Sequence, residues 1–142
     1  MTGTNGKTTV TYILEAILKA AGFKAGVIGT INYRFNNIML QAKNTTPGPV
    51  ELQSILSSMV KEKISYCAME VSSHALEQER VRGIDFHSAI FTNITQDHLD
   101  YHKTIAEYFL AKARLFKGLS SSSFAVLNYD DKHFLALKKM TK

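Results

Sequence analysis

The sequence contains a single cysteine, Cys67, so an intramolecular disulfide framework is excluded. Because Cys67 lies in an apolar run, we expect it to be a reduced residue of the core. No apolar stretch approaches the roughly 20 residues of a membrane-spanning helix, and no signal peptide is recognisable ahead of the first motif. We therefore expect a cytoplasmic protein with no membrane partner.

The charge of the chain is modest and scattered along the sequence. Its 17 Lys and Arg residues and 12 Asp and Glu residues give a net charge of +5. This distribution suits an anionic small molecule and falls short of the basic face that nucleic-acid binding needs. With 45% hydrophobic and 20% charged residues among 142, the chain is expected to fold as one monomeric domain with a single core.

Residues 2–9 read Thr-Gly-Thr-Asn-Gly-Lys-Thr-Thr and are typical of a loop that binds phosphate groups. Gly3 and Gly6 let the backbone turn tightly and bring its N–H groups close to an anion. Lys7 offers a positive charge to the outer phosphates of a nucleotide, and Thr8 offers a hydroxyl that can ligate Mg²⁺. The pattern predicts a nucleoside triphosphate site.

The loop departs from the full phosphate-loop pattern on its N-terminal side. Met1 stands where the pattern has its first glycine, and no strand precedes the loop in this sequence. A helix is predicted to follow over residues 10–21, with its N-terminal dipole directed at the same phosphates. The alternative, an ordinary helix N-terminus, explains the Gly-Lys-Thr triplet but not its agreement with the glycines and the helix. We expect the chain to be a piece of a longer protein, cut at the leading edge of this loop.

The rest of the chain alternates between strand-like and helix-like patterns. Further helices are predicted over residues 50–63, 104–116 and 132–139. Strands are predicted over residues 25–30, 66–71, 86–93 and 124–127, with a hairpin over residues 33–42 that turns at Asn36 and Asn37. The alternation predicts an α/β fold with a mainly parallel, P-loop-containing sheet flanked by helices, its N-terminal strand truncated.

Polar clusters follow two of the predicted strands. Residues 70–74 come directly after the second strand, and residues 93–102 follow the third. In such sheets ligands bind at the carboxyl ends of the strands, where the phosphate loop also lies. A carboxylate at the end of an apolar strand is costly to bury unless it is paired or binds a metal. Glu70 is therefore favoured as a Mg²⁺ ligand over a strand-end residue that faces solvent.

His98 lies in the segment Asp-His-Leu-Asp-Tyr-His, which suggests either a metal site or a polar turn that caps the next helix. Zinc is not favoured, because no second cluster of Cys or His has zinc spacing. Ser72, Gln78 and Arg80 fall on or beside a short segment after the second strand. They could bind a carboxylate or a phosphate, Arg80 as a bidentate partner.

Other residues carry weaker signals. Spacing alone says little about Lys112, since a lysine on a helix usually faces solvent. His74 beside two serines would suit a serine hydrolase, but the Gly-x-Ser-x-Gly motif of such enzymes is not found. The simplest interpretation places three methionines in the core: Met39, Met59 and Met69.

Taken together, these motifs resemble those of the Mur ligases, the ATP-dependent amide-forming enzymes of peptidoglycan synthesis. Residues 3–9 are similar to that family's version of the phosphate loop, which accounts for the departure at Met1. Residues 44–47, 69–74 and 97–102 resemble the type that makes UDP-N-acetylmuramoyl-tripeptide (MurE type). The resemblance covers residues 1–142 as the central, ATP-binding domain alone. It implies that an N-terminal UDP-binding domain and a C-terminal amino-acid-binding domain are absent.

The resemblance also implies roles for individual residues, carried over motif by motif. ATP would be bound by Gly3, Thr4, Asn5, Gly6, Lys7, Thr8, Thr9 and Asn93. The UDP-N-acetylmuramoyl-L-alanyl-D-glutamate substrate would be bound by Asn44, Thr45, Thr46, Ser72, Gln78 and Arg80. Mg²⁺ ions would be held by Thr8, Glu70, His98 and Lys112, the lysine as a carbamate. A lysine that forms a carbamate is expected to be partly buried. The groups implied to be catalytic are Lys7, Lys112, Glu70 and His98.

The activity implied is the ATP-dependent addition of a diamino acid, meso-diaminopimelate or L-lysine, to the UDP-linked dipeptide through an acyl phosphate. Two alternatives stay open. One is a related ligase such as a folylpolyglutamate synthase, which the string Glu-Val-Ser-Ser-His at residues 70–74 fits less well. The other is a nucleotide-binding module with no catalysis of its own, which predicts nucleotide binding without ligase turnover.

Overall fold

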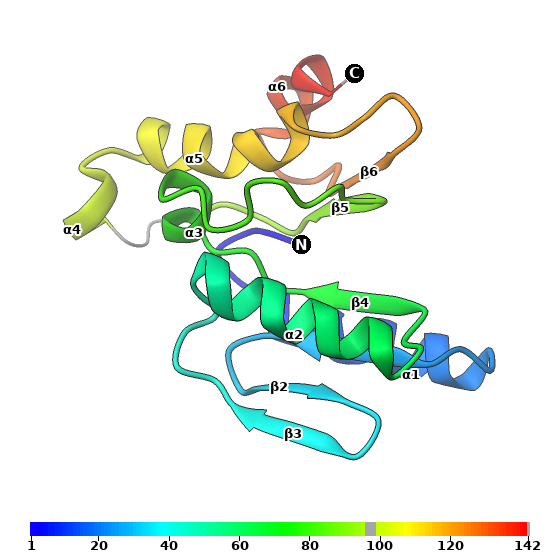
Figure 1. Ribbon diagram of the computed structural model, residues 1–142. Helices are drawn as coiled ribbons and strands as arrows, with labels where there is room; N and C mark the ends of the chain where they lie inside the picture. Colours follow the sequence, from blue (N-terminus) through cyan, green and yellow to red (C-terminus); the bar gives the residue numbers. More distant parts are fainter. Residues whose placement is uncertain (96–98, 142) are drawn as a thin grey trace.

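The computed structural model describes residues 1–95 and 99–141, and Figure 1 shows their strands lying between helices. One sheet has the strand order β3-β2-β1-β4, and β5 and β6 form a second pair. The strands are β1 (Ala25–Ile28), β2 (Asn32–Phe35), β3 (Ile38–Gln41), β4 (Tyr66–Met69), β5 (Ser88–Phe91) and β6 (Phe124–Leu127). The helices are α1 (Lys7–Ala20), α2 (Pro49–Lys61), α3 (Ser73–Glu77), α4 (Leu99–His102), α5 (Ile105–Lys117) and α6 (Phe134–Met140).

The first residues of the chain join the two sheets. Backbone hydrogen bonds of 2.6–3.1 Å link Met1 to Met69 and Val71 beside β4, and Thr2 to Ile90 and Thr92 beside β5. Thr2 also forms a parallel bridge with Phe91. The sequence predicts a truncated strand ahead of the phosphate loop, and Met1 and Thr2 occupy that strand position.

The sheet is mixed rather than mainly parallel. The pairs β1–β4 and β5–β6 are parallel, as the alternation of strands and helices predicts. The hairpin of β2 and β3 turns at Asn36 and pairs antiparallel on the other side of β1. The hairpin adds two antiparallel strands, so parallel pairing is found at β1–β4 and β5–β6, the strands nearest the phosphate loop.

Helices cover both faces of the β1–β4 sheet, with α2 in front of β4 and α1 behind it in Figure 1. Side chains of α2, α3 and α5 form one continuous core with β1, β4 and β5, which includes Leu52, Met59, Leu76, Phe91 and Phe116. Most of this core follows directly from the helical spacing of apolar residues in the sequence.

Helix α1 is unusual because its most buried residues are Thr11 and Glu15, whereas Ile13 and Ile17 are 52% and 58% exposed. Glu15 accepts hydrogen bonds of 3.2 Å from the Nε of Arg34 on β2, and one of 2.8 Å from Lys19. Burial alone would raise the pKa of Glu15, but the hydrogen bonds and charges of Arg34 and Lys19 outweigh it and lower that pKa. An ion pair therefore fastens α1 to the hairpin.

Two core assignments are wrong. Cys67 is exposed, because β4 is covered only over its second half, at Ala68 and Met69. Met39 is also exposed, since all four residues of the edge strand β3 face solvent to a large extent. Met59 and Met69 are buried as expected.

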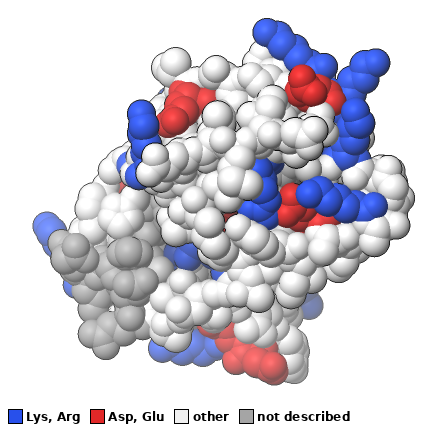
Figure 2. Space-filling view, turned by 90° about the horizontal axis from the view of Figure 1, so that it is seen from below, with Lys and Arg blue, Asp and Glu red and all other residues white. Residues whose placement is uncertain are grey.

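The surface has no single dominant charge on the face shown in Figure 2, where Lys and Arg side chains lie among Asp and Glu. This arrangement agrees with the scattered charges of the sequence. Within the described ranges, no helix is both long enough and apolar enough to cross a membrane.

Candidate functional site

The phosphate loop runs from the strand position of Thr2 into α1. Gly6 has a φ of 83° and caps the helix, so Lys7 is its first residue. Gly3 has a φ of 153°, and a Cβ there would collide with the hydroxyl of Thr92 and crowd the backbone of Asn93. The loop therefore needs glycine at residue 3 both for its backbone conformation and for the close approach of the neighbouring loop.

Two lysines converge on the loop. The Nζ of Lys7 donates hydrogen bonds of 2.9 Å to the carbonyl oxygens of Gly3 and Thr4. The Nζ of Lys112, on α5, donates one of 3.0 Å to the same Gly3 oxygen. The sequence could not show this second contact, because Lys112 is 109 residues away from Gly3.

Lys112 is only 1% exposed, and its ammonium group lies 4.2 Å from the centre of the Tyr108 ring. The alternative, Lys112 as a solvated surface residue of the helix, is therefore wrong, and the burial expected of a lysine that forms a carbamate is confirmed. The ammonium groups of both lysines lie within 3.0 Å of the Gly3 carbonyl oxygen, which concentrates positive charge at the phosphate loop.

Glu70 is 1% exposed at the end of β4, so it does not face solvent. Its carboxylate accepts hydrogen bonds from the hydroxyls of Thr8, at 3.1 Å, and Thr30, at 2.9 Å, and from the Thr30 N–H at 3.2 Å. No Lys or Arg in residues 1–95 and 99–141 forms an ion pair with it. A buried carboxylate surrounded by hydroxyl oxygens suits a hard divalent cation such as Mg²⁺, which takes oxygen ligands.

Four of the residues implied to bind the UDP-linked substrate form one hydrogen-bonded network beside Glu70. The hydroxyl of Thr46 donates to the Glu70 carbonyl oxygen at 2.9 Å and accepts from the Ser72 N–H at 3.0 Å. Arg80 donates to the carbonyl oxygen of Thr46 at 3.0 Å and to Gln78 at 2.6 and 2.8 Å. The other two members of the set also lie here: Thr45 contacts Thr30 at 3.1 Å, and Asn44 contacts Tyr33 at 2.6 Å.

Asn93 lies against the opposite side of the phosphate loop. Its carbonyl oxygen accepts from the Thr4 N–H at 2.8 Å, and its Oδ1 accepts from the Asn5 N–H at 3.0 Å. The backbone N–H groups of Thr4 and Asn5 are thus oriented by residues beyond β5. Asn93, which is implied to bind ATP although it is far from the phosphate loop in the sequence, therefore lies in contact with that loop.

Sequence reasoning missed a buried relay between α3 and α4. His102 Nε2 lies 2.8 Å from the Ser73 hydroxyl, and His102 Nδ1 lies 3.1 Å from the Glu77 carboxylate. The connectivity is that of a Ser–His–acid triad, but both Ser73 and His102 are buried and present no reactive atom to solvent. The relay therefore fastens α4 to α3 and gives no support to a hydrolase. The signal in the sequence is the last histidine of residues 97–102, a segment that predicts either a metal site or a polar turn.

The predicted ligand His98 lies outside the described residues. Within residues 1–95 and 99–141, no group of three or more His, Cys, Asp and Glu side chains is placed to hold a metal ion. Glu70 with the hydroxyl of Thr8 is therefore the part of the predicted metal site that the structure brings together.

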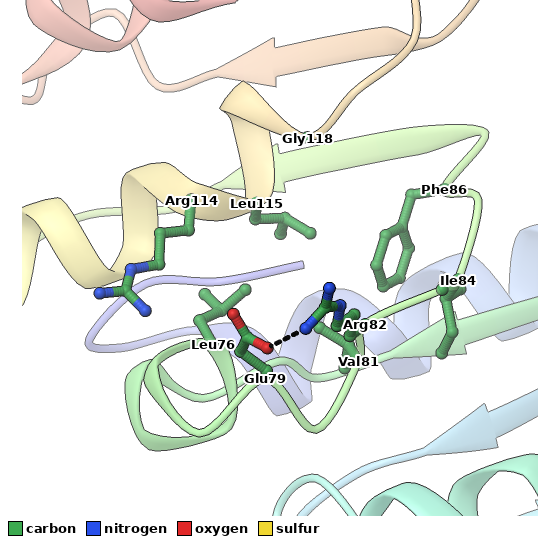
Figure 3. Close-up of a pocket in the computed structure, with 10 residues that line it drawn as sticks. Leu76, Glu79, Val81, Arg82, Ile84, Phe86, Arg114, Leu115 and Gly118 are labelled. Atoms are coloured by element: carbon green, nitrogen blue, oxygen red, sulfur yellow. Dashed lines mark hydrogen bonds and ion pairs between the residues drawn. The ribbon is translucent and has the colours of Figure 1, made fainter.

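A hollow lies elsewhere in the part of the chain that is described. It has a volume of about 440 Å³ and is lined by residues that follow α3 and by the end of α5 (Figure 3). Leu76, Val81 and Phe86 give it an apolar wall, and Arg82 and Glu79 form an ion pair of 2.9 Å across it. None of the predicted site residues lines this hollow.

Comparison with known proteins gives consistent matches. The family model described as the Mur ligase middle domain matches residues 1–142. A UDP-N-acetylmuramoyl-L-alanyl-D-glutamate--2,6-diaminopimelate ligase of Clostridium botulinum is 51% identical over 133 residues, which are 94% of this chain and 27% of that protein. The protein of the same name from Lawsonia intracellularis is 56% identical over 116 residues, which are 82% of this chain and 24% of that protein.

The fold has a solved counterpart. A structure of a UDP-N-acetylmuramoyl-L-alanyl-D-glutamate--2,6-diaminopimelate ligase superimposes with a TM-score of 0.86 at 35% identity. The match covers 98% of this chain and 28% of that one. The chain thus spans about a quarter of the length of the relatives that it matches.

Proposed function

The chain belongs to the Mur ligase middle-domain family, and we propose from this that it is the ATP-binding domain of an amide ligase of peptidoglycan precursor synthesis. The reaction would join 2,6-diaminopimelate to UDP-N-acetylmuramoyl-L-alanyl-D-glutamate. The names of the relatives favour diaminopimelate over lysine as the added amino acid. The rest of the ligase, including the UDP-binding and amino-acid-binding domains, would be supplied by polypeptide outside residues 1–142.

One observation carries the proposal: Lys7, Lys112 and the Thr8–Glu70 pair all lie on the phosphate loop or in contact with it. Such a site offers positive charge for phosphate groups and buried oxygen atoms for Mg²⁺. The network of Thr46, Ser72 and Arg80 begins at the backbone of Glu70, so an anionic acceptor bound there would lie next to the nucleotide.

Bound ATP with Mg²⁺ supplies the phosphoryl group that converts the unreactive acceptor carboxylate into an acyl phosphate, which the incoming amine can attack. The residues of the chain would bind, orient and neutralise charge, which accounts for most catalysis in phosphoryl transfer. Lys7 would hold the outer phosphates and Thr8 one Mg²⁺. Glu70 would hold a second Mg²⁺, together with His98 and a carbamate on Lys112.

The acceptor side depends on fixed geometry. Arg80 is held by Gln78 and by the Thr46 backbone, so its guanidinium group is already oriented before a ligand binds. Arg80 and the hydroxyls of Thr45 and Thr46 would position the carboxylate of the UDP-linked dipeptide for in-line attack.

The substitution Lys7→Ala tests the proposal in the full-length enzyme. Because Lys7 provides charge where phosphoryl charge moves, we expect ligase turnover to fall by at least about a hundredfold with the fold unchanged. The measurement is ADP release in the presence of ATP, the UDP-linked dipeptide and diaminopimelate. Lys61→Ala, at an exposed position near the end of α2, is the matched control and should retain full activity.

Unchanged turnover in Lys7→Ala would mean that the loop is not a nucleotide site. The two alternatives have their own outcomes in the same assay. Addition of glutamate to a folate would indicate the folylpolyglutamate synthase type of ligase. Nucleotide binding without any amide product would indicate a binding module.

A further inference from the structure

The phosphate loop is held in place by a second loop, residues 92–95, which follows β5. Besides the two bonds to Asn93, the Thr92 hydroxyl donates to the Asn5 carbonyl oxygen at 2.7 Å. The Thr95 N–H donates to the Thr4 hydroxyl at 3.0 Å, and the Asn5 side chain donates to Thr95 at 3.3 Å. The orientation of the peptide groups at Thr4 and Asn5 therefore depends on where the 92–95 loop lies.

The 92–95 loop is itself held by a third segment, the turn that follows β6. The Nδ2 of Asn128 donates to the Thr92 carbonyl oxygen at 2.7 Å. The Asp131 carboxylate accepts from the Ile94 N–H at 2.7 Å and from the backbone and ring of His133 at 2.8 Å each. The Asp131 side chain is only 6% exposed, so it is committed to these contacts and is not a solvated surface group.

We propose that Asp131 is a positioning residue for the nucleotide, acting through the Ile94 N–H and the 92–95 loop on the phosphate loop. The inference rests on the proposed function, because it assumes that the phosphate loop binds a nucleotide. Its basis is the continuous order of contacts, from Asp131 to Ile94, from residues 92–95 to the Thr4 and Asn5 peptide groups, and along the backbone from there to residues 6–8 of the phosphate loop.

The physical reason is preorganisation. Backbone N–H groups bind phosphate well only when they are already directed at it, since reorienting them on binding reduces the affinity. Without the Asp131 carboxylate, the Ile94 N–H loses this acceptor, and the turn after β6 then holds the 92–95 loop through Asn128. The phosphate loop would then sample orientations that do not bind.

The test is the substitution Asp131→Ala in the full-length protein, with the dissociation constant for Mg²⁺ and a non-hydrolysable ATP analogue measured by calorimetry. We expect a rise of about tenfold, the size of effect that losing one hydrogen bond to a charged group produces. The KM for ATP should rise in parallel while the KM for the UDP-linked dipeptide stays within about twofold, since Thr46, Ser72 and Arg80 are held at the Glu70 side of the phosphate loop, away from the contacts of residues 92–95 with Thr4 and Asn5. Amide hydrogen exchange in residues 3–5 should become faster.

Three further variants separate positioning from a general loss of structure. Asp130→Ala removes the adjacent, exposed carboxylate and should leave the dissociation constant unchanged. Asp131→Asn keeps an oxygen acceptor for the Ile94 N–H and should recover most of the affinity. Asn128→Ala removes the hydrogen bond from the turn after β6 to the Thr92 carbonyl oxygen and should also weaken nucleotide binding. This variant keeps the test valid if Asp131→Ala does not fold.

Nucleotide affinity unchanged in folded Asp131→Ala and Asn128→Ala, with normal binding by the unsubstituted protein, would overturn the inference and leave the proposed function intact. Equal increases in the KM values for ATP and for the UDP-linked dipeptide would also overturn it. Absence of nucleotide binding by the unsubstituted protein would overturn the proposed function, and the inference with it.

Discussion

Lys112 is the residue whose position most constrains the chemistry of the site. Its ammonium group is buried and shares the Gly3 carbonyl oxygen with Lys7. A second positive charge so close to Lys7 would repel a metal ion held by Glu70. A carbamate would carry a negative charge and offer two oxygen ligands instead.

We expect Lys112→Ala in the full-length enzyme to reduce ligase turnover by at least about a hundredfold, as the loss of a group that places charge in an active site does. Short carboxylic acids, added to the assay, should restore part of the activity by placing a carboxylate where the carbamate had been. Lys117→Ala, at an exposed position on the same helix, is the control and should behave like the unsubstituted enzyme.

Full activity of Lys112→Ala would rule out any role for the residue in catalysis. Loss of activity that no carboxylic acid relieves would contradict the carbamate while leaving Lys112 essential.

Individual residues differ in how well the sequence predicted them. Glu70 could be identified because a carboxylate that ends an apolar strand is unusual, and its burial confirms the prediction that it does not face solvent. Lys112 could not be placed from spacing, since its burial depends on where α5 lies against the phosphate loop. Cys67 was wrongly assigned to the core because the apolar run of β4 extends beyond the part of the strand that the helices cover.

At the scale of elements, the phosphate loop is constrained by its contact with the 92–95 loop. Gly3→Ala introduces a Cβ that meets Thr92 and the Asn93 backbone, at a φ that side chains rarely adopt. We expect a loss of about 1–3 kcal/mol in the free energy of unfolding, measured by urea denaturation. Gly48→Ala is the control, because nothing lies within 4 Å of its Cβ position and its φ is −65°. Equal stability of the two variants would mean that the loops are not tightly joined.

The attachment of α1 to the hairpin predicts a dependence of stability on pH. The pKa of Glu15 is lower in the folded protein than in the unfolded chain, because the bonds from Arg34 and Lys19 outweigh its burial. Its contribution is therefore present above the unfolded pKa of about 4.3 and is lost as the pH falls through the lower, folded pKa. Urea denaturation at a series of acidic pH values should show this loss.

The variant Arg34→Met provides the comparison for that measurement. It should be less stable than the unsubstituted protein at neutral pH, and its stability should fall less on acidification because Glu15 has lost its main partner. An identical fall in both proteins would show that Glu15 does not contribute to the acid dependence.

The sequence predicted most of the longer elements. The hairpin, α2, α5 and β6 lie within a few residues of their predicted bounds, because each has a clear period or turn signal. The short helices α3 and α4 were missed as helices, since four or five residues are too few to show a period. The sequence also did not predict that α1 buries a polar face, because the burial of Glu15 depends on Arg34, which lies in a different element.

At the scale of the whole molecule, Met1 and Thr2 connect the two sheets, because Met1 pairs with the end of β4 and Thr2 pairs with the end of β5. The sequence pattern gave no sign of this, since two residues have no detectable strand periodicity. The consequence is that the ends of β4 and β5 lie on either side of the phosphate loop. The residues implied to bind acceptor and nucleotide therefore meet at one edge, as expected for the carboxyl ends of parallel strands.

The most direct test of the account is the product formed by the full-length enzyme from ATP, UDP-N-acetylmuramoyl-L-alanyl-D-glutamate and meso-diaminopimelate, identified by mass spectrometry. We predict the UDP-linked tripeptide with one ADP and one phosphate released per amide bond, and no product from the 142-residue chain alone. Absence of the tripeptide from a folded, nucleotide-binding full-length protein, with either diaminopimelate or lysine as the amine, would contradict the account.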